Sequence, residues 1–356
     1  MILSYEQEIR LLTSLFRAAG LSAEDAALLA EVPTLSDFLG VESHGLSRGI
    51  MYVVGLAKGF ANAKAEFKIL SETDATMKVD ADDGVGVLSM IKTYGKLSEK
   101  AKKQGIAIAE GINSSNIGCG YYYAKKASED NLILLACANT TPLQAPFGGA
   151  DPLIGSNPII AGVPSAGDFP VVLDMATTLV AFGKIQAAQR KGTPIPDSWC
   201  LDKEGRPTTD PNAYYTNVPF GSYKGYGLAV FVDMFAAVLS GAAYGTKIGF
   251  ATRGELEKSG WSMILVDPSF FMPIDEFKER VNDYVGMMKN ARKAEGVAEI
   301  FVPGEKEYLT YCKRMEEGFY VEPTLEATVL AVGKSIGLFK EDQSLEDFLK
   351  EQSTEI

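Results

Sequence analysis

The stretch that decides the fold class is residues 104–138, QGIAIAEGINSSNIGCGYYYAKKASEDNLILLACA. Gly105 ends a preceding amphipathic segment and leads into a strand predicted over residues 106–110. Residues 121–129 have the composition of a helix, and the apolar run 132–138 is typical of a buried strand. Strand, helix and strand in succession indicate a domain of the α/β or α+β class, in which helices pack on a sheet.

Before this stretch the hydrophobic period changes from that of strands to that of a helix. Residues 67–70 and 75–79 are predicted strands that a short polar turn joins. Residues 90–103 carry Lys and Glu on one side and form a predicted helix. The sheet therefore begins near residue 66.

The first sixty residues are predicted to be helical. Ser4 and Gln7 form a capping box, and Gly20 is a natural stop. A second helix is expected to kink at Pro33, because proline removes a backbone donor. A third helix is expected over residues 44–58.

After residue 221 the pattern predicts a long apolar helix over 226–240, a strand over 262–266, a helix over 275–292 and a strand over 299–302, followed by two closing helices. No GxGxxG motif follows a strand and opens a helix anywhere in the chain. A Rossmann domain is therefore not expected.

Composition excludes several classes of protein. The chain has 356 residues, of which 46% are hydrophobic and 22% charged, enough for a buried core. The net charge of −12 comes without a basic stripe, so nucleic acid is not an expected partner. Apolar runs are too short to cross a membrane, and a cytoplasmic location is expected. Four cysteines without a CxxC pair and one histidine indicate reduced thiols and no metal site.

The only histidine, His44, lies in the pattern Ser43-His44-Gly45, followed by Arg48 and Tyr52. On a continuous helix, residues 44, 48 and 52 would share one face. Imidazole exchanges protons near neutral pH, and a guanidinium fork matches a carboxylate. This pattern indicates an acid/base group beside a carboxylate clamp for a 2-oxo acid. The alternative is a helix-start histidine whose hydrogen bonds are made with solvent or with the backbone, with Arg48 on the surface.

Five segments have residues suited to a phosphate or nucleotide. Asn139-Thr140-Thr141-Pro142 and Gly155-Ser156-Asn157-Pro158 follow a buried strand, and such loops present backbone donors or simply make turns. Asp174 stands before a predicted helix start, where it caps the helix or holds a ribose hydroxyl. Gly221 to Gly227 place Tyr223 and Lys224 in a glycine-rich turn, which suits a pyrophosphate. Glu305, after Pro303-Gly304, meets an adenosine hydroxyl or caps the next helix.

Taken in order, these blocks resemble the malate/L-lactate dehydrogenase family of the non-Rossmann type, which also includes ureidoglycolate, sulfolactate and diketogulonate enzymes. The matching residues span nearly the whole chain. They are Gly40-Val41-Glu42-Ser43-His44-Gly45, Asn113-Ser114 with Gly118, Gly155-Ser156-Asn157-Pro158, Leu173-Asp174-Met175-Ala176-Thr177, Tyr223-Lys224-Gly225-Tyr226-Gly227-Leu228 and Pro303-Gly304-Glu305.

The resemblance implies a central mixed-sheet α+β domain that binds NAD(P), and a helical region built from both chain ends. The expected units are residues 1–65, 66–304 and 305–356, the last packing on the first. It also implies a homodimer, NAD as cofactor with NADP as the alternative, and a small 2-hydroxy or 2-oxo acid as substrate.

The resemblance further implies the roles of single residues. His44 is the expected proton donor in the reductive direction, with Arg48 and Tyr52 as its catalytic partners at the substrate and with Ser43 and Asn116 also binding substrate. The expected cofactor-binding residues are Thr140, Asp174, Met175, Ala176, Thr177, Tyr223, Lys224, Gly304 and Glu305.

Two positions depart from the family pattern. The family usually has a histidine where this chain has Asn116, and a Gly-His pair where it has Gly260-Trp261. Asparagine donates and accepts hydrogen bonds but carries no proton or charge. His44 is therefore the only imidazole that the site can use.

The expected reaction moves a hydride from C2 of the substrate to the nicotinamide while neutral His44 takes the hydroxyl proton. Malate with oxaloacetate is the first expectation, and ureidoglycolate, sulfolactate and lactate are the alternatives. An alternative of another class is a catalytically silent nucleotide-binding protein.

Overall fold

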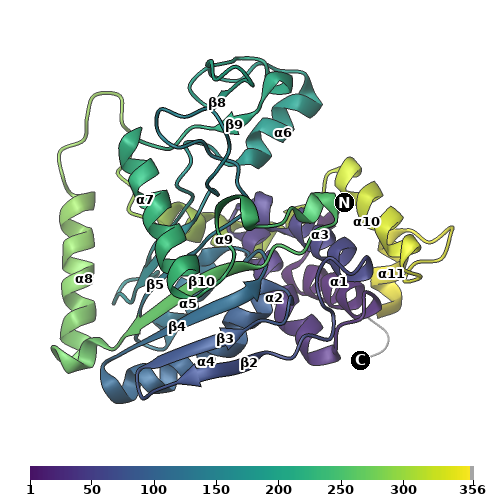
Figure 1. Cartoon of the computed structure of the whole chain (residues 1–356). Helices are drawn as coiled ribbons and strands as arrows, with labels where there is room; N and C mark the ends of the chain where they lie inside the picture. The colour runs from purple at the N-terminus through teal and green to yellow at the C-terminus, as the bar shows by residue number, and fades with distance from the viewer. Residues whose placement is uncertain (353–356) are drawn as a thin grey trace.

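The computed structural model describes residues 1–352, and within them a central sheet of seven strands has the order β2-β3-β4-β10-β5-β6-β7 (Figure 1). The strands are β2 (Lys68–Glu72), β3 (Thr76–Asp80), β4 (Ile106–Ser114), β5 (Ile133–Ala138), β6 (Ile159–Val163), β7 (Val171–Met175) and β10 (Ser259–Val266). Strands β3 and β4 pair in parallel, and the other neighbours pair antiparallel. The predicted α+β fold with a mixed sheet is confirmed.

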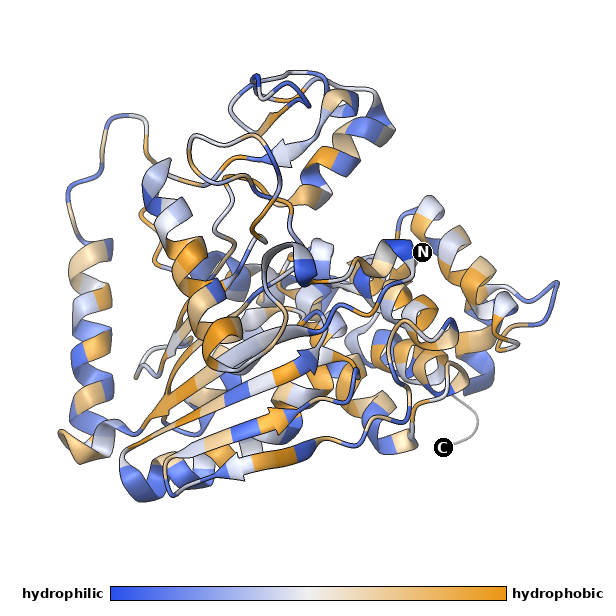
Figure 2. Cartoon of the chain, in the orientation of Figure 1, coloured by the Kyte–Doolittle hydropathy of each residue, from blue (hydrophilic) through white to orange (hydrophobic). Residues whose placement is uncertain are grey.

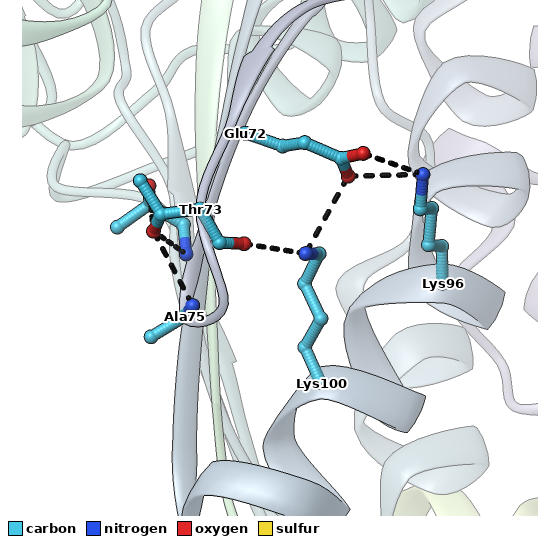
Figure 3. A network of polar contacts seen from close by, with 6 residues as sticks. Glu72, Thr73, Ala75, Lys96 and Lys100 are labelled. Atoms are coloured by element: carbon cyan, nitrogen blue, oxygen red, sulfur yellow. Dashed lines mark hydrogen bonds and ion pairs between the residues drawn. The ribbon is translucent and has the colours of Figure 1, made fainter.

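One face of the sheet is covered by α4 (Gly86–Gln104) and α5 (Gly120–Glu129). Apolar side chains of β4, β10 and both helices form the main core on this side. At the sheet edge, the β2–β3 hairpin is tied to α4 by two lysines: Lys96 and Lys100 lie 2.9 and 3.4 Å from the Glu72 carboxylate (Figure 3). Lys100 also donates to the Thr73 carbonyl at 2.5 Å, so the turn of the hairpin is held against the helix.

The opposite face carries α7 (Tyr223–Asp233) and the π-helix η3 (Met234–Leu239). Cys137 of β5 packs there against Val232 and Ala236. The helix predicted over residues 226–240 thus begins three residues earlier and changes to π-helical geometry in its second half. Figure 2 shows that α7 and the strands beneath it are rich in apolar residues.

The two chain ends meet in a helical region beside the sheet (Figure 1). It contains α1 (Tyr5–Ala18), α2 (Ala23–Phe38), α3 (Leu46–Ala57), α10 (Pro323–Ser335) and α11 (Leu345–Gln352). The capping box of Ser4 and Gln7 is present, and β1 (Ile2–Leu3) pairs antiparallel with β11 (Phe319–Tyr320). The expected helical region built from both ends is confirmed, while the unit boundaries at residues 65 and 304 stay predictions.

A small lobe lies at one end of the sheet, above it in Figure 1. Helix α8 (Ile274–Lys289) lies to the left of the sheet in the same view. The lobe contains α6 (Phe182–Lys191), β8 (Cys200–Leu201) and β9 (Thr216–Asn217). The strand predicted over residues 299–302 is wrong, because this segment is irregular and leads into α9 (Glu305–Glu317). Here the Val302 N–H donates to the Glu305 side chain at 3.0 Å. Among the helices of residues 1–352, none combines the length and apolarity needed to cross a membrane.

Candidate active site

His44 lies in a short 3₁₀ turn, η1 (Glu42–His44), directly before α3. The prediction of one helix over residues 44–58 is wrong at its start, because Gly45 has a non-helical backbone and α3 begins at Leu46. The Leu46 N–H donates to Asp37 Oδ2 at 2.5 Å, which starts the helix there. Arg48 and Tyr52 are therefore one turn apart on α3, and His44 reaches the same region from the preceding turn.

The His44 ring is half-buried and is held by its neighbour, with Ser43 Oγ 2.9 Å from Nδ1. Burial, and after it the charge of Arg48, lower the pKa of His44 to about 4. The imidazole is therefore neutral at pH 7. When Nδ1 carries the proton and donates to Ser43, Nε2 has a free lone pair and can accept a proton.

Arg48 is half-buried, and its Nε finds no hydrogen-bond partner among residues 1–352. A buried guanidinium N–H without a partner calls for an acceptor from outside the chain. Its planar fork suits a carboxylate. Part of the Arg48 guanidinium is thus closed off from solvent, which favours the carboxylate clamp over the surface alternative.

A carboxyl group that the sequence did not suggest, that of Glu257, lies near enough to Arg48 for their charges to interact. Burial raises the pKa of Glu257 to about 7, and the nearby Arg48 charge opposes this rise. Glu257 lies in the loop before β10 and no motif surrounds it. Only the pairing of β10 with β4 brings this loop beside residues 114–116, so sequence patterns contain no signal for it.

Asn116 lies at the site and is bound by Tyr52. The Tyr52 hydroxyl donates to Asn116 Oδ1 at 2.5 Å, and the Gly118 N–H donates to the same oxygen at 3.0 Å. Because a backbone N–H can only donate, the atom it meets must be the amide oxygen. The Asn116 Nδ2 group has no hydrogen-bond acceptor within residues 1–352 and can donate to a ligand.

Trp261, the other departure, does not belong to the site. Its side chain is fully buried under α4, and its Nε1 donates to Ser89 Oγ at 2.9 Å. The indole fills the space over Gly111, where any Cβ would overlap it. Position 261 thus contributes packing between the sheet and α4.

Three of the loops predicted to bind a nucleotide are joined by hydrogen bonds. Thr140 Oγ1 accepts from the Ser156 N–H at 3.0 Å, and the Thr177 N–H donates to the Ser156 carbonyl at 2.8 Å. The Phe220 N–H in turn donates to the Thr177 carbonyl at 3.1 Å, which connects this group to the start of α7. Gly155 is required here, because a Cβ would overlap the Thr140 carbonyl.

Asp174 is part of strand β7 and caps a helix other than the one expected. Its Oδ2 accepts from the Tyr121 N–H at 3.1 Å, at the start of α5, and lies 3.6 Å from Cys119 Sγ. The helix start expected just after residue 174 is wrong, since α6 begins only at Phe182. The segment 116–121 therefore links Asn116 of the candidate site to Asp174. Met175 and Ala176, which come directly after Asp174, are half-buried.

Tyr223 and Lys224 are in the first turn of α7, not in a turn before it. Both side chains are exposed, and within residues 1–352 the Lys224 ammonium has no hydrogen-bond or ion-pair partner. The Tyr223 ring meets the Phe147 ring edge-on, with centroids 6.3 Å apart. A free cation beside helix N–H groups is a suitable place for an anion.

The Pro303-Gly304-Glu305 block lies against β7, because the Val172 N–H donates to the Pro303 carbonyl at 3.1 Å. Gly304 has φ +89° in the left-handed region, and it precedes the first residue of α9. The Glu305 carboxylate is buried and engaged, since it pairs with Lys289 and accepts from the Val302 N–H. A cofactor role for Glu305 stays a prediction.

Comparison with known proteins identifies the family. The family model described as malate/L-lactate dehydrogenase matches residues 3–329. L-sulfolactate dehydrogenase of Methanocaldococcus jannaschii is 36% identical over 96% of this chain and 99% of the relative. A solved sulfolactate dehydrogenase structure from that organism has a TM-score of 0.89, with 36% identity over 98% of this chain and 99% of that chain.

Two further relatives bear other names. Malate dehydrogenase of Pyrococcus horikoshii is 32% identical over 93% of this chain and 93% of the relative. Ureidoglycolate dehydrogenase (NAD(+)) of Escherichia coli O157:H7 is 29% identical over 90% and 93%. The resemblance inferred from the sequence blocks is confirmed. This chain belongs to the malate/L-lactate dehydrogenase family and is an enzyme of the dehydrogenase class.

Proposed function

We propose that this enzyme transfers a hydride between a nicotinamide cofactor and a small 2-hydroxy or 2-oxo acid, with malate and oxaloacetate as its substrates. The observation that carries the proposal is a neutral imidazole, His44, beside Arg48, whose guanidinium keeps a buried N–H without a partner. A proton acceptor next to a carboxylate-binding fork is what oxidation of a 2-hydroxy acid requires.

The residues expected to hold the cofactor fit an anionic dinucleotide. Lys224 and the first N–H groups of α7 suit its diphosphate, because this ammonium has no partner among residues 1–352. Thr140, Thr177 and the backbone of Asp174 to Ala176 are the proposed contacts at the neighbouring strand end. Gly304 completes the set, since its left-handed backbone brings the chain close to β7.

The residues of the chain have distinct roles in the proposed reaction. Arg48 binds the C1 carboxylate, and His44 takes the proton of the C2 hydroxyl at Nε2 while Ser43 holds Nδ1. When bound, the nicotinamide supplies the hydride acceptor or donor. In reduction, protonated His44 returns its proton to the ketone oxygen. Tyr52 orients Asn116, whose Nδ2 donates to the substrate.

Sulfolactate is as well supported as malate. Relatives with similar identity to this chain are named for either acid. Both acids have a C1 carboxylate and a C2 hydroxyl, so Arg48 and His44 suit them equally. They differ in the second anionic group, which is a carboxylate in malate and a sulfonate in sulfolactate. Ureidoglycolate and lactate, which have a single carboxylate, are the further alternatives.

The test is a panel assay with the purified protein. NADH or NADPH is mixed with oxaloacetate, pyruvate and the 2-oxo acid of sulfolactate, and absorbance of the reduced nicotinamide is followed. Oxidation with a dianionic acid supports the proposal, and its loss in His44→Gln assigns the proton transfer. Cofactor binding without oxidation by any acid would instead indicate a silent nucleotide-binding protein. Comparison of the two cofactors decides between NAD, our first choice, and NADP.

We also propose a cytoplasmic homodimer that uses the outer face of α7 and η3. Phe231, Met234 and Val238 lie on one face of these helices and are each more than half exposed. Such a contiguous apolar face suits a second copy of the chain. Free cysteines, three of them buried, suit a reducing compartment. Light scattering should give twice the chain mass, and Phe231→Glu with Met234→Glu should give monomers. An unchanged mass in that double variant would contradict this interface.

A further inference from the structure

Two acidic side chains meet in the helical core directly beneath the His44 turn. Glu8 of α1 is fully buried and Asp37 of α2 is 1% exposed. Neither Glu8 oxygen finds a hydrogen-bond donor among residues 1–352, and the group that Glu8 faces is the Asp37 carboxyl. Two ionised carboxylates only accept hydrogen bonds, so a proton must lie between them if the contact is to be favourable.

The surroundings do not compensate two negative charges. Within residues 1–352, Arg314 of α9 is the cation whose charge acts on the pair, but it donates to the Asp37 backbone carbonyl and to Glu42 Oε1, the latter at 2.6 Å. Glu42 adds a further negative charge from the η1 turn, and Tyr5 faces Glu8 along α1. Burial raises the pKa of Glu8 well above its ordinary value, and burial likewise raises the pKa of Asp37 to about 7.

The pair is in direct contact with the turn that carries His44. Asp37 Oδ2 accepts the Leu46 N–H that starts α3. The backbone of Gly45 packs directly against the same Asp37 carboxylate, so that any Cβ at position 45 would overlap it. The His44 N–H donates to the Val41 carbonyl at 2.9 Å, so the turn is one hydrogen-bonded unit. A change in the charge of the pair therefore acts on the residue next to His44.

We propose that Glu8 and Asp37 are positioning residues for His44, in which Glu8 keeps its proton and donates it to Asp37 while Asp37 holds the Leu46 N–H. Loss of the Glu8 proton places two facing carboxylates under Gly45. Their repulsion moves Asp37 away from Leu46 and releases the His44 turn. This inference rests on the proposed function, since His44 is the group whose position matters.

The experiment uses the fact that the chain has one histidine. In untagged protein, the carbon-bound ring protons of a ¹³C-labelled histidine give a signal that belongs to His44 without further assignment. The signal is followed from pH 6 to pH 10 in the parent, in Glu8→Gln and in Glu24→Gln. Glu8→Gln keeps a donor of the same shape but cannot ionise, and Glu24 is an exposed residue of α2 that serves as the control.

We expect the His44 signal to shift above about pH 8 in the parent and in Glu24→Gln, and to stay constant above about pH 8 in Glu8→Gln. A change near pH 7 that all three proteins share belongs to Glu257, which titrates there beside Arg48. Persistence of the shift in Glu8→Gln, or its absence in the parent, would overturn the proposal. This readout needs no turnover, so it remains decisive even if none of the acids in the panel is reduced.

Kinetics supply a second test in the active enzyme. In the oxidation direction the parent should lose kcat at alkaline pH, in addition to the rise in KM that ionised Glu257 is expected to cause. Glu8→Gln should keep kcat within about threefold at pH 7 and lose the alkaline decline in kcat. Asp37→Ala removes the acceptor of the Leu46 N–H and should lower kcat at least tenfold, and Asp37→Asn should recover most of it. A folded Glu8→Gln enzyme that has lost kcat tenfold at pH 7 would also contradict the proposed neutral Glu8.

Discussion

If His44 is the proton acceptor, kcat/KM for oxidation should stay nearly constant as the pH falls from 7 to 5. Oxidation needs neutral His44, whose pKa is lowered to about 4 by burial and by Arg48. At pH 5 about nine tenths of such a group is neutral, whereas a histidine with the ordinary pKa of about 6.5 would be only about 3% neutral. The two cases therefore differ about 30-fold in kcat/KM for oxidation at pH 5.

Reduction should show the complementary behaviour. It consumes a proton, so its kcat/KM should fall about tenfold for each pH unit above pH 5 if His44 supplies that proton. The assay measures initial rates with malate and with oxaloacetate between pH 5 and pH 8.5 at constant ionic strength. His44→Gln should lose about 10²- to 10⁴-fold in both directions. A decline in oxidation centred near pH 6.5, or an active His44→Gln enzyme with the parent profile, would contradict the assignment of His44 as a proton acceptor with a lowered pKa.

Three further changes test other parts of the site. Arg48→Lys should raise KM for the acid about tenfold and change kcat less, because an ammonium replaces two parallel hydrogen bonds by a point charge; steady-state kinetics with an unchanged KM would contradict this. Since the pKa of Glu257 is raised to about 7, its carboxylate should compete with substrate for Arg48 above that pH. KM should then rise with pH in the parent and not in Glu257→Gln, and a parallel rise in both would exclude Glu257 as the cause. Trp261→His should lower the free energy of unfolding by about 3 kcal/mol in urea titrations, because it empties a buried site, and should add no activity; unchanged stability would contradict the packing role.

Local patterns predicted most of the elements but not how they combine. Periodicity located the strands around residues 106–110 and 132–138, and Ser4 with Gln7 marked a real helix start. The insertion of β10 between β4 and β5 could not be predicted, because it depends on pairing between segments far apart in the chain. The missing strand at 299–302 shows the same limit: its composition suits a strand, but the segment is irregular and only the adjoining Pro303 carbonyl pairs with the edge strand β7.

The candidate site was predictable where one short segment contains the chemistry. Ser43, His44 and Arg48 are close in sequence, so their meeting needs only local structure. The break at Gly45 was missed because its cause, the Asp37 carboxylate, comes from the preceding helix. Glu257 was missed for the same reason, since its approach to Arg48 depends on the sheet. Buried charges that act on a site from other elements leave no mark in its local sequence.

The two departures from the family pattern have different consequences for the reaction. At position 261 the tryptophan is buried under α4 and is not part of the candidate site, so it removes no functional group from that site. At position 116 the asparagine takes the Tyr52 hydrogen bond and keeps a donor for the substrate, but it cannot deliver a proton. In the proposed mechanism proton transfer then depends on His44 alone, so any group that displaces its turn should affect the rate. This dependence is why the buried Glu8–Asp37 pair, which contacts no substrate, should matter for catalysis.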